Sequence, residues 1–193
     1  MQANDLQTVI FLGRPGSGKG TQAKLLAKKT GWSIFSSGDT LKALIGQENA
    51  LGRKVKEDYM SGQLAPDWLV EYLFLKATID AGDNGIIYEG FPRRLSQAEH
   101  VDTVLSWLER PYKVIDLEVS EEVALKRQLD RAKVEDRPDS DGEEKIKARF
   151  AVYREHTEPV AKFFDEKGLL LKIPGEETQE EIFAAISAAL HIA

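Results

Sequence analysis

Residues 13–21, with the sequence GRPGSGKGT, have the types and spacing of a loop that binds phosphate groups. They follow the apolar run 8–12 and precede a helical pattern. In this setting glycines let successive backbone N–H groups turn toward phosphate oxygens, and the helix presents its positive end. Lys19 adds a mobile positive charge. Gly20 stands where the strict motif has a Ser or Thr whose hydroxyl binds the metal ion. The hydroxyl comes one residue later, at Thr21, so whether Thr21 is a metal ligand stays open.

A glycine-rich turn without any ligand is the alternative interpretation of this segment. It would require four glycines, a lysine and a strand-helix context to coincide by chance. The phosphate-binding interpretation is therefore the stronger one.

Glu89 follows a predicted strand and begins the segment EGFPRR. A carboxylate at the carboxyl end of a parallel strand faces the crevice where ligands bind in open α/β sheets. Glu89 could therefore hold magnesium through water. A solvent-exposed loop carboxylate is the alternative, because a single acidic residue after a strand is weak evidence.

Four arginines lie in or near a charged segment in the second half of the chain. Arg127 and Arg131 are four residues apart and share a helix face, Arg137 lies in the segment KVEDRPDSDG, and Arg149 lies on the next predicted helix. A solvated, salt-bridged face would explain such a pair. In a chain with a phosphate loop, however, these cations are suited to surround a phosphoryl group during transfer.

Composition limits the class of protein. The 193 residues, 42% of them hydrophobic, suit one globular domain, and the net charge of -6 argues against a nucleic-acid surface. The chain has no cysteine, which excludes disulfides and cysteine-ligated metal sites and fits a reducing compartment. We expect a cytoplasmic protein with no signal peptide and no membrane span. We also predict no obligate protein partner.

Short apolar runs alternate with amphipathic stretches and predict a five-stranded parallel sheet covered on both faces. The predicted strands are 8–12, 33–35, 85–88, 114–119 and 169–173. The longer predicted helices are 18–29, 67–81, 96–110, 120–132, 142–167 and 178–190. Residues 37–66 and 133–142 do not extend the sheet pattern, and loops of their composition can move as lids.

Four motifs make the chain resemble the nucleoside monophosphate kinases, and most closely the adenylate kinases. They are GRPGSGKGT at 13–21, SSGDTLK at 36–42, EGFPRRLSQ at 89–97, and the RxxxR, DRPDSD and KARF series from Arg127 to Phe150. The resemblance implies an α/β P-loop three-layer fold with small NMP-binding and lid insertions. It divides the chain into a core (1–36, 67–131 and 142–193), an NMP-binding lobe (37–66) and a short lid (132–141).

The resemblance also implies the reaction and its residues. The reaction is reversible, Mg²⁺-dependent transfer of the terminal phosphoryl group of ATP to AMP, giving two ADP, which maintains the balance of adenine nucleotides. The ATP-binding residues would be Gly16, Ser17, Gly18, Lys19, Gly20, Thr21, Arg127, Arg131 and Glu177. The AMP-binding residues would be Ser37, Lys42, Gln63, Leu64, Ala65, Gly90, Arg93, Gln97, Arg137 and Arg149. The catalytic residues would be Lys19, Arg93, Arg131, Arg137 and Arg149, with Glu89 holding the metal through water.

Three positions depart from the family pattern. Lys42 stands where adenylate kinases usually have arginine, so a point charge replaces a bidentate fork and we expect looser contact with the acceptor phosphate. Glu89 stands where aspartate is usual, which moves the carboxylate toward the water shell of magnesium. Ser140 separates two acidic residues of the lid. Zinc is not expected, because the lid is short and lacks cysteine.

The attacking group in this reaction, a phosphate oxygen, is already ionised at neutral pH, so no general base is needed. A UMP/CMP-type kinase is the nearest alternative. Ser37 and Gln97 favour adenine in the resembling family, and an amide can pair with the adenine edge. A nucleotide-operated switch is the alternative from another class, but a guanine-reading NKxD is excluded because the chain has no Asn-Lys pair.

Overall fold

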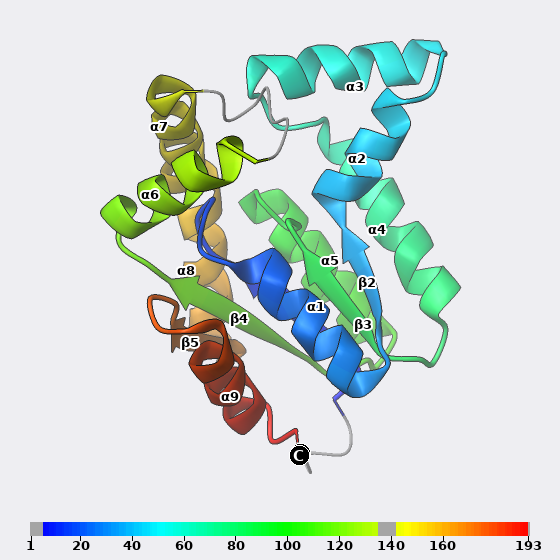
Figure 1. Cartoon of the computed structure of the whole chain (residues 1–193). Coiled ribbons are helices and arrows are strands. Elements are labelled where there is room, and N and C mark those ends of the chain that lie inside the picture. Colours follow the sequence, from blue (N-terminus) through cyan, green and yellow to red (C-terminus); the bar gives the residue numbers. More distant parts are fainter. Residues whose placement is uncertain (1–5, 135–141, 193) are drawn as a thin grey trace.

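A computed structural model describes residues 6–134 and 142–192 of the chain. Within these residues the centre is one sheet of five parallel strands in the order β2-β3-β1-β4-β5 (Figure 1). The strands are β1 (Thr8–Leu12), β2 (Ser33–Ser36), β3 (Ile86–Glu89), β4 (Tyr112–Glu118) and β5 (Leu170–Pro174). The α/β class and the five predicted strands are confirmed, with ends that differ by at most two residues.

Helices connect the strands. They are α1 (Lys19–Thr30), α2 (Ser37–Ile45), α3 (Ala50–Ser61), α4 (Asp67–Ala81), α5 (Leu95–Trp107), α6 (Glu121–Ala132), α7 (Glu143–Val152), α8 (Glu158–Glu166) and α9 (Gln179–Ala189). The single predicted helix 142–167 is wrong in one respect. A π-helical turn, η2 (Tyr153–Thr157), separates α7 from α8. Pro159 is the second residue of α8, and because it has no N–H to donate, the regular helical hydrogen bonds cannot continue there. Among the described residues no helix is both long and apolar enough to cross a lipid bilayer.

Alternate side chains of β1 enter two cores on opposite faces of the sheet, as the two-residue period of a strand requires. Ile10 packs with Phe74 in the layer that contains α4, α5 and α8. Val9 and Phe11 pack with Leu26 in the layer of α1 and α9. Both faces of the strand are therefore buried, which explains why its sequence is apolar from Val9 to Leu12.

Arg110 holds the amino ends of β1 and β3 together. Its side chain is buried, its Nε donates to Thr8 Oγ1 at 2.7 Å, and its Nη1 donates to the carbonyl oxygen of Gly82 at 2.5 Å. The remaining nitrogen donates to the carbonyl oxygens of Gln7 and Asn84. The predicted helix 96–110 ends earlier, at Trp107, which leaves Arg110 outside the helix to make these contacts.

The carboxyl ends of the strands are left open between two groups of helices. Figure 1 shows α2 and α3 on one side of this edge and α6 and α7 on the other. Residues 37–66 contain α2 and α3, and their role as a separate NMP-binding lobe stays a prediction. Most of the segment 132–141 lies outside the described residues.

Candidate active site

The predicted phosphate loop joins β1 to α1. Gly13, Gly16 and Gly18 have φ angles of 134°, 92° and 94°, a conformation that side chains rarely adopt. At Gly16 a Cβ atom would lie 2.6 Å from the carbonyl oxygen of Ala124, so only glycine lets the loop pack against α6. The loop therefore presents its N–H groups at the amino end of α1, where an anion is stabilised.

Lys19 is the first residue of α1, and its Nζ donates to the carbonyl oxygen of Arg14 at 3.2 Å. Its ammonium group thus folds back over the loop. Burial lowers the pKa of Lys19 to about 8, and Arg93 and Arg149 lower it as well, while Glu89 raises it. The cations of this site therefore repel one another, and a bound polyphosphate would relieve that repulsion.

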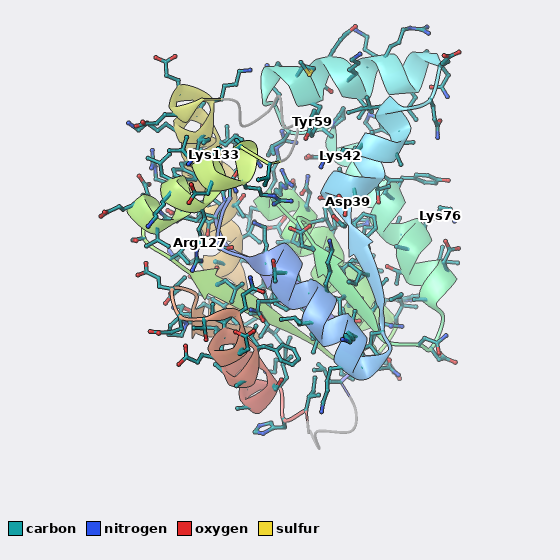
Figure 2. The ribbon with its side chains drawn as sticks, in the orientation of Figure 1. Asp39, Lys42, Tyr59, Lys76, Arg127 and Lys133 are labelled. Atoms are coloured by element: carbon teal, nitrogen blue, oxygen red, sulfur yellow. The ribbon has the colours of Figure 1, made fainter. Side chains whose placement is uncertain are left out.

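A pocket of about 720 Å³ lies along the open edge of the sheet and reaches from the phosphate loop to α2 and α3. Figure 2 labels Lys42 and Tyr59 on the α2–α3 side and Arg127 on the α6 side. The pocket lining includes the sequence-predicted residues Gly16, Ser17, Gly18, Lys19, Gly20, Thr21, Lys42, Gln63, Leu64, Ala65, Glu89, Gly90, Arg93, Arg127, Arg131, Arg149 and Glu177. Arg137 lies outside the described residues.

Ser37 and Gln97, the remaining predicted residues, line a second cavity of about 20 Å³. It shares Leu64, Gly90 and Arg93 with the large pocket. The two cavities therefore adjoin, and the site residues predicted within the described part of the chain lie around one continuous region.

The carbonyl oxygen of Gly90 connects two parts of the predicted AMP site. It accepts a hydrogen bond from Ser37 Oγ at 2.6 Å and another from Arg93 Nε at 2.7 Å. Gly90 has a φ of 77°, and a Cβ atom there would lie 2.6 Å from Ser37 Oγ. The first turn of α2 is thus joined directly to the loop after β3, which aligns Arg93.

Gln97 holds the backbone of this loop. Its Oε1 accepts from the N–H of Arg93 at 2.8 Å and of Arg94 at 3.3 Å, and its Nε2 donates to Asp67 Oδ1 at 2.8 Å. Asp67 also pairs with the Arg94 side chain. The amide oxygen and one N–H of the amide are thus engaged with protein, and the pairing of Gln97 with the adenine edge stays a prediction.

Glu89 ends β3 and is held by Ser36, whose Oγ donates to Glu89 Oε2 at 3.0 Å. Within the described residues no group of three or more acidic or histidine side chains could hold a metal ion alone. A single carboxylate suits magnesium, which usually keeps several waters and takes its other ligands from substrate phosphates.

The arginines on the other side contact the turn after β5 and the helix α6. Arg127 Nη1 donates to the carbonyl oxygen of Gly175 at 2.7 Å, which holds the turn that leads to Glu177, a predicted ATP-binding residue. Glu176 Oε1 accepts from the N–H of Ser120 at 2.7 Å and ties the same turn to the start of α6. Arg149 Nη1 donates to Gln128 Oε1 at 3.3 Å.

Several residues at this site have no counterpart in the sequence analysis. They are Gln128, Tyr153 and Thr157, which line the pocket, and Asp116, which pairs in the sheet with Leu12, directly before the phosphate loop. Burial, together with the nearby charge of Glu118, raises the pKa of Asp116 to about 6. Polar residues on helices carry no motif, but Pro159 inside a predicted helix is a signal that could have marked η2.

Comparison with known proteins agrees with this geometry. The family model for adenylate kinase matches residues 11–169. An adenylate kinase of Thermus thermophilus is 41% identical over 187 residues, covering 96% of this chain and 98% of that protein. Adenylate kinases of Parabacteroides distasonis and Thermobifida fusca are 38% and 37% identical, and each match covers at least 94% of this chain and 97% of the relative. The chain therefore belongs to the adenylate kinase family, phosphotransferases that convert ATP and AMP into two molecules of ADP.

Proposed function

We propose that this chain binds ATP at the phosphate loop and α6, binds AMP between α2–α3 and the loop after β3, and transfers the phosphoryl group where the two sites meet. The observation that carries the proposal is the continuous pocket that has the phosphate loop at one side and Arg93 and Lys42 at the other. Such a pocket can align a donor and an acceptor phosphate for in-line transfer.

The chemical difficulty is to bring two polyanions together, since the attacking phosphate oxygen needs no deprotonation. Lys19, Arg93, Arg131 and Arg149 line the pocket and come from four different elements or loops. In our proposal they neutralise the repulsion and stabilise the charge on the transferring group. Burial is the first cause of the lowered pKa of Lys19, and the further lowering by Arg93 and Arg149 supports a site where gathered positive charges favour a bound anion.

Magnesium would supply additional positive charge at the donor phosphates. In our proposal Glu89 holds it through water, with Ser36 orienting the carboxylate. The single carboxylate supports this role because Mg²⁺ bound mainly by nucleotide and water needs few protein ligands.

We further propose that residues 37–66 and 132–141 act as lobes that close over the two nucleotides. Arg137, on the second of these segments, would then join the other cations only after closure. This order would protect ATP from hydrolysis, because water is the competing acceptor until AMP is bound. We propose maintenance of the adenine nucleotide balance in the cytoplasm as the cellular setting.

The test is a comparison of AMP, UMP, CMP and GMP as acceptors, with ATP and magnesium held constant. We expect AMP to have the highest kcat/KM. A higher value for UMP or CMP would contradict the assignment of Ser37 and Gln97 to adenine. A Lys42→Arg variant sharpens the test, since a bidentate guanidinium should lower the KM for AMP while the KM for ATP stays constant.

A further inference from the structure

Thr157 is the last residue of η2 and is buried beside the pocket. Its Oγ1 donates a hydrogen bond to the carbonyl oxygen of Arg93 at 3.1 Å, although the two residues are 64 positions apart in the chain. The bond therefore links the helical segment after α7 to the loop after β3.

The Arg93 backbone is thus held from both sides. Its N–H donates to Gln97 Oε1 at 2.8 Å, and its carbonyl oxygen accepts from Thr157. Its side chain is held in addition, since Nε donates to the carbonyl oxygen of Gly90 at 2.7 Å. The position of the guanidinium group depends on all three contacts, of which the one from Thr157 comes from a different part of the chain.

The same helical turn also meets the phosphate loop. Tyr153 is four residues before Thr157, so the two side chains share a helix face, and both line the pocket. The Arg14 guanidinium lies over the Tyr153 ring, 5.9 Å from its centroid. Arg149 is four residues before Tyr153 on the adjoining helix α7. One face of this helical stretch therefore carries a cation of the site and contacts both the donor and the acceptor loops.

We propose that Thr157 is a positioning residue for phosphoryl transfer. Its hydroxyl fixes the Arg93 carbonyl and thereby sets the separation between Arg93 and Arg149. The π-helical form of the turn supports a role of this kind, because single π-turns inside helices occur often at functional sites. The inference rests on the role proposed above for Arg93.

Thr157→Val removes the hydroxyl and keeps the branched shape, whereas Thr157→Ser keeps the hydroxyl. We expect Thr157→Val to lower kcat by about tenfold and to raise the KM for AMP, because small displacements of a positioned group are costly to transfer. We expect the KM for ATP to stay constant. Thr157→Ser should restore kcat to within about twofold of the wild type.

Thr78→Val is the matched control. Thr78 is also buried, and its hydroxyl donates to the carbonyl oxygen of Phe74 at 2.8 Å or bonds the Tyr88 hydroxyl at 2.7 Å, but it lies on α4 and does not line the pocket. Thermal melts should show a stability loss for Thr78→Val at least as large as for Thr157→Val, with unchanged kinetics for Thr78→Val. If Thr157→Val keeps wild-type kcat and KM for AMP, or if Thr157→Ser is as defective as Thr157→Val, the proposal is wrong.

Combining Thr157→Val with Arg93→Ala tests the role of Thr157 separately from the role proposed for Arg93. If Thr157 acts through Arg93, adding Thr157→Val to Arg93→Ala should cause no further loss of kcat. An additional tenfold loss in the double variant would overturn the positioning role and leave the role of Arg93 intact. Wild-type turnover of Arg93→Ala alone would instead contradict the proposed function.

Discussion

The donor and acceptor halves of the pocket are built in different ways. Hydrogen bonds within the phosphate loop join close neighbours, such as Ser17 N–H to the carbonyl oxygen of Arg14 at 3.0 Å, and the long-range bonds of the donor half hold the turn after β5 to α6. The acceptor half is held by bonds between distant segments, with Ser37 bound to Gly90 across 53 residues and Thr157 bound to Arg93 across 64. The phosphate loop should therefore respond mainly to the loss of its own charge, and the acceptor half also to changes in the contacts that align it.

Loss of the Lys19 charge should have the largest effect on activity that this comparison predicts. Lys19→Ala should lower kcat/KM for ATP by about 10²–10³-fold, because a positioned cation typically contributes about 2–4 kcal/mol to the transition state. The free energy of unfolding at neutral pH should not fall. Since the folded pKa of about 8 lies below the ordinary 10.5, charged Lys19 opposes folding below pH 8.

A coupled ADP assay and a thermal melt measure these two effects. Lys28→Ala, an exposed lysine on the same helix, is the control and should behave as the wild type. Wild-type turnover of Lys19→Ala would remove the basis for the donor half of the comparison.

Arg93→Ala tests the acceptor half in the same way. We expect a loss in kcat of about 10²-fold, with a higher KM for AMP, because the guanidinium lies between the acceptor loop and the pocket. ATP binding, measured by calorimetry without AMP, should change little. Arg53→Ala on α3 serves as the control for charge. If ATP and AMP affinities fall equally, the two halves are not separate.

The pH dependence distinguishes the free donor site from the occupied one. As pH rises through about 8, free Lys19 loses its proton, so kcat/KM for ATP should fall toward a limiting slope of about tenfold per pH unit. The corresponding fall in kcat should begin at a higher pH than the fall in kcat/KM, since bound polyphosphate favours the charged form of Lys19. In Lys19→Arg the fall in kcat/KM near pH 8 should disappear, because guanidinium keeps its charge. If the fall remains in this variant, it must come from the titration of another group.

Ser37→Ala should give the smallest effect. It removes the hydrogen bond to the Gly90 carbonyl oxygen and leaves Arg93 Nε bound to that oxygen. We expect the KM for AMP to rise about 3–10-fold, in line with the loss of one neutral hydrogen bond, with no change in the KM for ATP. Ser33→Ala, an exposed serine on β2, is the control. An increase in the KM for ATP would show that α2 also supports the donor half.

The same difference decides what could be predicted from the sequence. The phosphate loop is contiguous, so its strand, its glycines and Lys19 follow from local pattern, and β1 has the predicted bounds. Residues of the acceptor half came from family resemblance, and the bonds that hold them could not be predicted. The use of the Gln97 amide by Arg93 and Asp67, and the link from Thr157, arise only when distant segments pack together.

Arg110 has a consequence for how the molecule can deform. Its guanidinium joins the segments that enter β1 and β3 with the end of α4, all at the edge of the sheet opposite the pocket. Sliding of one strand past its neighbour would break several of these bonds at once. We therefore expect displacements that accompany nucleotide exchange to be confined to the helices at the open edge, with the sheet as a fixed base for them.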